Sequence, residues 1–187
     1  MIYVIPGILG FMACCLFDIN KIRWNIRFLN LFFVIGSVLL IGSSILCILQ
    51  ADFSSIFSNF GFYHWLMLLG LLLSIAGEIY ALFFALPFED TYMESEHVSV
   101  ISKGWYAACR HPGFWALTLV YLFLWLLLSN IELFYALIAY TLSNFLYICI
   151  QDRYIFPRYI QGYDEYRKKV PFLVPTKNSL RNAFSKK

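Results

Sequence analysis

The chain has 187 residues, of which 61% are hydrophobic, 20% are aromatic and only 13% are charged. A soluble globular domain is typically about 25% charged, so this composition excludes an ordinary water-soluble fold. The apolar residues form blocks long enough to cross a bilayer, for which about 20 helical residues are needed. We therefore predict an all-α, polytopic integral membrane protein with about five transmembrane helices, formed as a single membrane domain over residues 1–187.

Three apolar blocks within residues 1–88 are expected to form three N-terminal transmembrane helices. They span residues 2–17, 28–49 and about 60–88. No basic residue precedes the first block, which argues against a cleaved signal peptide, and we expect its helix to end at Asp18 and Asn20. The third block contains Glu78. Because a carboxylate is costly to place within a membrane, Glu78 is expected to be functional or to serve as a protonated hydrogen-bond donor.

Two further apolar blocks, residues 112–128 and 131–150, are separated only by Ser129-Asn130. They are expected to form a tight antiparallel helical hairpin. His111 lies 19 residues before Asn130, and Asp152 lies 22 residues after it. At about 1.5 Å of rise per residue these are roughly 29 and 33 Å of helix, so His111 and Asp152 are expected at nearly the same depth.

The basic residues predict how the chain is oriented in the membrane. All 14 lysines and arginines fall within residues 21–27, 103–110 and 153–187. By the positive-inside rule these segments are cytoplasmic, which places the N-terminus outside and both the loop 89–111 and the C-terminal segment 151–187 in the cytoplasm. The net charge of +3 is therefore interpreted as orientation and contact with membrane lipids, not as nucleic-acid binding.

A polar segment, residues 100–114, precedes the hairpin and reads Val-Ile-Ser-Lys-Gly-Trp-Tyr-Ala-Ala-Cys-Arg-His-Pro-Gly-Phe. Pro112 is suited to the first position of a helix, where its missing N–H costs nothing. Arg110 and His111 would then lie at the helix N-terminus, where free N–H groups and the helix dipole favour an anion. This segment is therefore expected to bind an anionic group of a small molecule.

The same residues carry a family resemblance. Gly104-Trp105-Tyr106 followed by Arg110-His111-Pro112-Gly113-Phe114 resembles the Gly-x-Tyr-x3-Arg-His-Pro-x-Tyr signature of the isoprenylcysteine carboxyl methyltransferase family. The second half of that pattern, a paired carboxylate followed by Tyr-x-x-Tyr and Val-Pro, is similar to Gln151-Asp152, Tyr163-Asp164-Glu165-Tyr166 and Val170-Pro171. Members are membrane enzymes that use S-adenosylmethionine, and phospholipid N-methyltransferases are relatives. The resemblance covers residues 77–175.

This resemblance implies a cofactor site for S-adenosylmethionine. The residues expected to bind the cofactor are Gly104, Tyr106, Arg110, His111, Pro112, Phe114, Gln151 and Asp152. Arg110 suits the carboxylate of the cofactor and Asp152 suits its ammonium or ribose hydroxyls, so these two are also the expected catalytic residues.

The methyl acceptor is expected to be lipophilic, either a small molecule or a lipidated substrate. Glu78, Tyr163 and Tyr166 are candidates for contacting it, although the tyrosines also fit an aromatic belt at the membrane surface. Cysteine and histidine spacing fits no common zinc pattern, so no metal site is predicted.

Three positions depart from the family pattern. Gln151 replaces the first of two acidic residues, Phe114 replaces a tyrosine, and Ala81 falls where an arginine is often found. If Asp152 carries the whole carboxylate role, Gln151→Glu is expected to be tolerated. Two alternatives stay open: an NADPH-dependent membrane reductase, because steroid reductases have a similar Arg-His-Pro-Asn-Tyr motif, and a catalytically degenerate structural membrane protein.

Overall fold

The computed structural model describes residues 1–84 and 104–184, and these residues contain helices and no strand. The long helices are α1 (Ile5–Arg23), α2 (Leu31–Ile48), α4 (Phe62–Ile79), α7 (Pro112–Leu128) and α8 (Ile131–Ile150). The shorter elements are η1 (Ile2–Val4), η2 (Arg27–Asn30), α3 (Phe53–Ser58), η3 (Tyr80–Phe84), α6 (Trp105–Ala108), η4 (Gln151–Ile155), α9 (Phe156–Tyr159), α10 (Tyr163–Lys169) and α11 (Lys177–Phe184). The predicted end of the third helix and most of the loop 89–111 lie outside the described residues.

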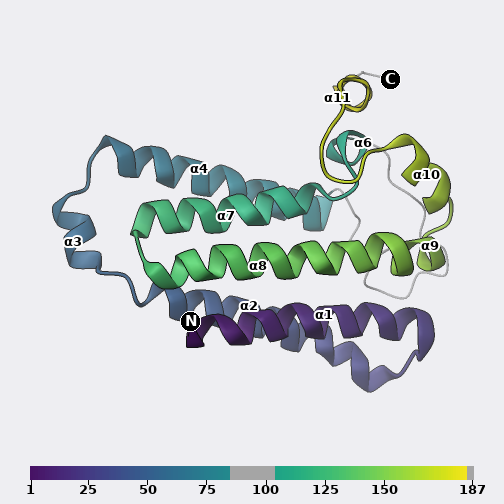
Figure 1. Cartoon of the computed structure of the whole chain (residues 1–187), viewed down its shortest axis with the longest axis horizontal. Coiled ribbons are helices and arrows are strands. Elements are labelled where there is room, and N and C mark those ends of the chain that lie inside the picture. The colour runs from purple at the N-terminus through teal and green to yellow at the C-terminus, as the bar shows by residue number, and fades with distance from the viewer. Residues whose placement is uncertain (85–103, 185–187) are drawn as a thin grey trace.

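Helix length and composition confirm a polytopic membrane protein. Four apolar segments are long enough to cross a bilayer: Ile2–Arg23, Arg27–Ile48, Phe62–Leu82 and Ile131–Tyr159. The fifth, Pro112–Leu128, is shorter but equally apolar in character and lies beside the others in the bundle (Figure 1). The predicted bounds of α7 and α8 are those of the structure.

The first helix is longer than predicted, because α1 continues through Asp18 and Asn20 to Arg23. Asp18 is tolerated inside the helix because its carboxylate accepts hydrogen bonds from Tyr147 and Gln151 of the C-terminal half. Asn20 instead organises the turn that follows the helix. Its side chain donates to the carbonyl of Ile26 and accepts from the N–H of the same residue, at 3.0 Å in both cases.

The α7–α8 hairpin forms as predicted. Ser129 ends α7 in the left-handed conformation, with φ +47°. The Asn130 side chain accepts from the N–H of Glu132 at 2.8 Å, which caps α8. It also donates to the carbonyl of Cys47 at 2.9 Å and so attaches the hairpin turn to the end of α2.

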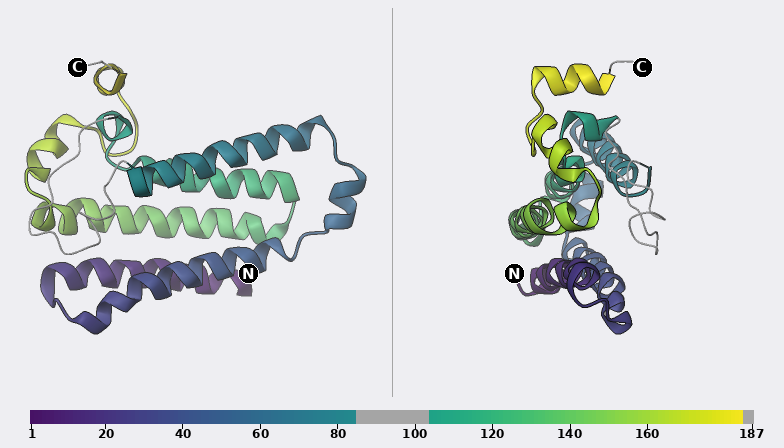
Figure 2. Two further views of the ribbon diagram at one scale, coloured as in Figure 1. Left: turned by 180° about the vertical axis from the view of Figure 1, so that it is seen from behind. Right: turned by 90° about the vertical axis from the view of Figure 1, so that its right-hand side faces the viewer.

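Helix α8 is the centre of the bundle. It packs against α7 on one side and against α1 and α2 on the other, whereas α4 packs against α7 (Figures 1 and 2). Two close approaches depend on glycine. A Cβ on Gly10 would lie 2.7 Å from the backbone oxygen of Gly36, and one on Gly7 would overlap the buried ring of Tyr140. Small residues at such crossings are typical of packed membrane helices.

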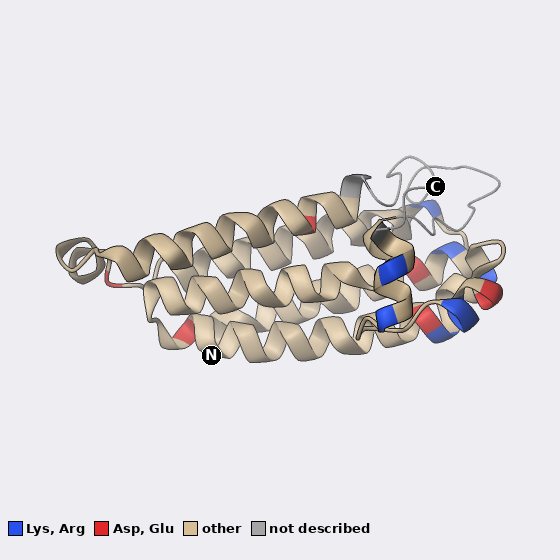
Figure 3. Cartoon of the chain, turned by 90° about the horizontal axis from the view of Figure 1, so that it is seen from above, with Lys and Arg blue, Asp and Glu red and all other residues tan. Residues whose placement is uncertain are grey.

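Beyond α8 the chain forms a small second core at one end of the bundle. Its buried residues are Ile160, Tyr163, Tyr166 and Val170. Lysines and arginines gather at this same end, where α6, α9, α10 and α11 lie (Figure 3). The charge segregation read from the sequence therefore corresponds to one pole of the folded molecule, which is where the candidate site is found.

Candidate functional site

Arg110 and Asp152 form a buried, bidentate ion pair at the basic end of the bundle. Nε of Arg110 donates to Oδ1 of Asp152 at 2.7 Å, and Nη2 donates to Oδ2 at 3.1 Å. The two side chains are only 9% and 6% exposed. Nε2 of His111 lies 3.4 Å from Oδ1 of Asp152. The prediction that the two halves of the motif meet at one depth is therefore confirmed.

The Arg110 side chain also holds the C-terminal segment. Nη1 donates to the carbonyls of Arg167 at 2.9 Å and Val170 at 2.7 Å, while the backbone N–H of Arg110 donates to the carbonyl of Pro171 at 2.9 Å. Four of the five guanidinium N–H groups are thus directed at protein atoms. In this geometry Arg110 positions the segment after α10 and has little capacity left for a ligand carboxylate.

Asp152 is similarly occupied by the protein. In addition to Arg110, it accepts a hydrogen bond on Oδ1 from the hydroxyl of Tyr163 at 2.7 Å. Burial and the adjacent Asp152 carboxylate raise the pKa of Tyr163, which therefore remains a hydroxyl donor. Asp152 is not among the residues that line the nearby cavity. The structure thus places Asp152 in the supporting framework, whereas the sequence led us to expect it to face a ligand.

Tyr166 and Tyr106 connect the elements around the motif. The hydroxyl of Tyr166 donates to the carbonyl of Tyr106 at 2.6 Å, and the hydroxyl of Tyr106 donates to the carbonyl of Ala81 at 3.2 Å. Burial raises the pKa of Tyr166, so its hydroxyl stays protonated. Gly104 adopts φ +57°, and a Cβ there would lie 2.9 Å from the hydroxyl of Tyr80. These contacts give the Gly-x-Tyr half of the motif a packing role.

His111 is a motif residue that lines the cavity described below, although its side chain is buried. Its ring stacks on Phe156 at 5.9 Å between centroids and meets Phe172 edge-on at 5.2 Å. Burial lowers the pKa of His111, against the opposing effect of Asp152, so the ring is neutral near pH 7. Its Nε2 is buried without a hydrogen-bond partner among the described residues. An unpartnered buried polar atom beside a cavity is a feature that a ligand can satisfy.

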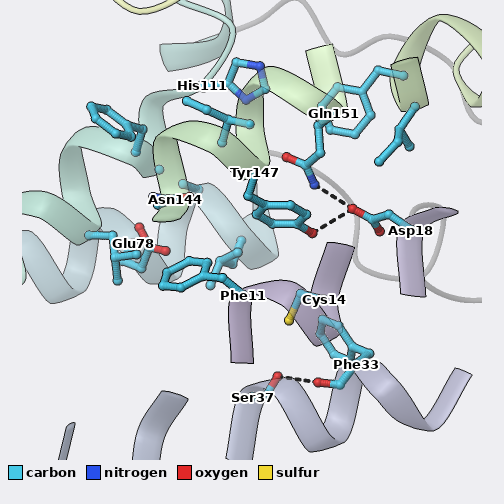
Figure 4. A pocket seen from close by; sticks show the side chains of 18 of the residues that line it. Phe11, Cys14, Asp18, Phe33, Ser37, Glu78, His111, Asn144, Tyr147 and Gln151 are labelled. Atoms are coloured by element: carbon cyan, nitrogen blue, oxygen red, sulfur yellow. Dashed lines mark hydrogen bonds between the residues drawn. The ribbon is translucent and has the colours of Figure 1, made fainter. Parts of the chain in front are cut away.

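A cavity of about 270 Å³ lies directly beside this cluster, between α1, α2, α4, α7 and the end of α8 (Figure 4). Its lining is mostly apolar and aromatic. The sequence-predicted residues that line it are Glu78, Tyr106, Arg110, His111, Phe114 and Gln151. The predicted residues outside the lining are Gly104, Pro112, Asp152, Tyr163 and Tyr166. The candidate binding surface therefore comprises about half of the predicted site together with the N-terminal helices.

Asp18 of α1 is the site residue that sequence reasoning missed. Its carboxylate lines the cavity and accepts hydrogen bonds on Oδ2 from Tyr147 at 2.7 Å and Gln151 at 2.8 Å (Figure 4). We expected Asp18 to end the first helix. The apolar residues Ile19 and Ile22 continue the helical pattern past Asp18, and this pattern could have indicated that the helix extends beyond it.

Glu78 lies on the opposite side of the cavity from Asp18 (Figure 4). Its Oε2 is buried without a hydrogen-bond partner among the described residues. The same oxygen lies 3.5 Å from the position of a Cβ on Gly113, in the first turn of α7. The helix N-terminus that was expected to attract a ligand anion thus faces a carboxylate of the protein itself.

Comparison with known proteins leaves the resemblance as a prediction. No family model, no curated protein and no solved structure matches the chain. The resemblance to membrane methyltransferases therefore rests on the two halves of the motif alone, and the contacts between Arg110, His111 and Asp152 show only that these residues lie together in the fold.

Proposed function

We propose that this chain is a membrane enzyme that transfers a methyl group from S-adenosylmethionine to a lipophilic acceptor. The observation that carries the proposal is the cavity, which combines apolar and aromatic walls with Asp18, Glu78, His111 and Gln151 inside a bundle of membrane-spanning helices. An apolar pocket with a few convergent polar groups is the usual form of a small-molecule site.

The acidic side chains of the cavity suit the positively charged groups of the proposed cofactor. S-adenosylmethionine carries a positive sulfonium and a positive ammonium, and the carboxylates of Asp18 and Glu78 both line the space. The aromatic rings of Phe11, Phe114 and Phe156 line it as well, and aromatic faces attract cations. When bound, the cofactor would supply a methyl group whose carbon bonds to a lone pair of the acceptor while the carbon–sulfur electron pair remains on sulfur.

The residues of the chain would contribute positioning and exclusion of water. Rate enhancement of a displacement comes largely from holding the reacting groups in line in a dry site. The neutral ring of His111 lines the cavity, and Gln151 fixes Asp18 on the cavity wall. Arg110 and Asp152 keep the segment after α10 attached to the start of α7.

The cations of the cavity wall disfavour NADPH as the cofactor, because both already have partners in the protein. A dinucleotide phosphate carries several negative charges and needs uncommitted cations to bind them. Among the described residues that line the cavity, the basic side chains are those of Lys21 and Arg110. Arg110 is paired with Asp152, and the ammonium of Lys21 lies over the rings of Phe17 and Tyr159. Ionisable side chains within a membrane usually mark a functional site, which favours a ligand-binding role over that of a purely structural protein.

We also propose that the basic pole of the bundle faces the cytoplasm, in accordance with the positive-inside rule. The cavity then lies at the cytoplasmic side of the membrane. A lipophilic acceptor would reach it from the bilayer, because the helices that wall it expose apolar side chains along their outer faces.

The test uses membranes that contain the full chain and S-adenosylmethionine labelled on its methyl group. We expect label to appear in the lipid or lipidated-product fraction. Asp164→Asn, an exposed acidic position on α10, serves as the matched control for Asp18→Asn on the cavity wall. The control should retain labelling and Asp18→Asn should lose most of it. Label confined to small aqueous products contradicts the lipophilic acceptor.

A further inference from the structure

Asp18 is an unusually placed carboxylate, since it lies within a membrane-spanning helix and is only 7% exposed. Burying a carboxylate at such a position is costly unless the charge is compensated. Tyr147 of α8 and Gln151 of η4 provide hydrogen bonds to the same oxygen, Oδ2, and they lie four residues apart where η4 continues α8. Two hydrogen-bond donors therefore hold this carboxylate on the cavity wall.

The surroundings of Asp18 are suited to a positive charge. Phe11 of α1, Phe33 of α2, and Phe156 and Tyr159 of α9 line the same cavity. A cation of the protein already uses one of these faces, because Nζ of Lys21 lies 5.4 Å from the ring centre of Tyr159. The same ammonium lies 4.9 Å from the ring centre of Phe17, outside the cavity lining. A carboxylate next to aromatic faces is the usual arrangement for binding organic cations.

We infer that Asp18 is the residue that binds the positively charged group, an ammonium or a sulfonium, of the ligand that fills this cavity. The aromatic rings supply the walls, and the neutral amide of Gln151 fixes the carboxylate without adding a competing charge. The inference rests on the proposed function only where the cation is the methyl donor. A cationic head of an amphiphilic acceptor would satisfy the same chemistry.

Two matched pairs of probes distinguish these sources by calorimetry on the purified full chain in lipid nanodiscs. S-adenosylmethionine and S-adenosylhomocysteine differ by the methyl group and its positive charge. Oleylamine and oleyl alcohol differ by the charge of the head group. We expect the wild type to prefer at least one charged probe over its neutral partner. Asp18→Asn should reduce that preference by roughly tenfold or more, while affinity for the neutral partner stays within about twofold.

The pair that loses its preference identifies the source of the cation. Loss for S-adenosylmethionine assigns Asp18 to the methyl donor, and loss for oleylamine assigns it to the acceptor. If the wild type binds oleylamine through Asp18 but does not bind S-adenosylmethionine, the proposed cofactor is wrong and the inference stands. No preference for either charged probe in the wild type, or an unchanged preference in Asp18→Asn, overturns the inference.

A second variant keeps the test decisive if Asp18→Asn does not fold. Lys21→Met removes the neighbouring ammonium and leaves Asp18 with its two donors in place. If Asp18 binds a ligand cation, the charged probe should bind severalfold more tightly to Lys21→Met, because a competing positive charge has been removed. Unchanged or weaker binding of the charged probe to this variant overturns the inference. Asp164→Asn is the surface control and should match the wild type in all titrations.

Discussion

Gln151 donates a hydrogen bond of 2.8 Å to Asp18, and this contact joins the first and last membrane-spanning helices at the edge of the cavity. From the sequence, Gln151 was expected to bind the cofactor and was noted as a departure from the acidic pair of the family that the motif resembles. The structure gives the departure a physical reason, because a donor is needed beside a buried carboxylate and a second carboxylate cannot donate when ionised.

Gln151→Glu is therefore expected to be destabilising, which reverses the tolerance expected from the sequence. It places two carboxylates in contact and should cost about 3–5 kcal/mol, the range for an uncompensated buried charge. Gln151→Met removes only the donor and should cost about 1–3 kcal/mol. Thermal unfolding of both variants in lipid nanodiscs measures which of the two is less stable. A Gln151→Glu protein as stable as Gln151→Met would show that a second carboxylate adds no unfavourable charge beside Asp18, and a Gln151→Met protein as stable as the wild type would show that Asp18 does not rely on this donor.

The fold was largely predictable because bilayer-length apolar blocks and a two-residue turn leave few alternatives. Residue counting from Asn130 also placed His111 level with Asp152, and the 3.4 Å contact confirms it. The direction in which each side chain points was not predictable in this way. Arg110 and Asp152 satisfy each other and the C-terminal segment, and nothing in a single sequence distinguishes such a pair from two ligand-binding residues.

The contribution of the N-terminal helices to the cavity could not be predicted from the sequence either. Asp18 reaches the cavity only because α1 packs against α8, a contact between residues more than 120 positions apart. Local patterns carry no information about such pairings in a chain without periodic repeats. Glu78, by contrast, was identified as an exceptional residue from its position in an apolar block, and it does line the cavity.

Orientation is tested by the position of the hairpin turn relative to the C-terminus. Ser129 lies at the pole opposite the basic segments, and α11 lies at the basic pole (Figures 1 and 3). Reporter domains fused after Ser129 and after the last residue should therefore appear on opposite sides of the membrane, with the C-terminal reporter in the cytoplasm. Two cytoplasmic signals would contradict the proposed topology.

Glycine at the α1–α2 crossing is expected to be required for packing. In Gly10→Ala the new Cβ would lie 2.7 Å from a backbone oxygen of Gly36, which cannot move without shifting α2. We expect a loss of about 1–3 kcal/mol in unfolding free energy. Gly42→Ala on α2 is the matched control, because its Cβ meets nothing within 4 Å, and helix propensity favours alanine by up to about 1 kcal/mol. Equal stability of the two variants would argue against the close crossing.

His111 is expected to make stability depend on pH below its ordinary pKa of 6.5. Burial lowers the pKa in the folded state, so below pH 6.5 the unfolded chain takes up a proton that the folded chain does not. Stability is therefore fully present above pH 6.5 and falls as the pH decreases, by at most about 1.4 kcal/mol per pH unit. His111→Gln should flatten unfolding curves compared between pH 7.5 and 5.5, whereas His64→Gln, outside the site, should not. A wild-type slope in His111→Gln would assign the dependence to another group.

Arg110 is expected to act first on structure and only through it on ligand binding. Arg110→Ala leaves Asp152 buried without its bidentate partner, which should cost up to about 3–5 kcal/mol, and it also frees the carbonyls of Arg167 and Val170. Hydrogen exchange should therefore rise in α10 and in the segment after it, with or without ligand. The double variant Arg110→Met with Asp152→Leu removes both charges and should recover part of the lost stability, since apolar pairs often replace buried ion pairs at little cost. If Arg110→Ala instead keeps wild-type exchange in α10 and loses only affinity for S-adenosylmethionine, Arg110 contacts the cofactor directly and the framework role assigned to it here is wrong.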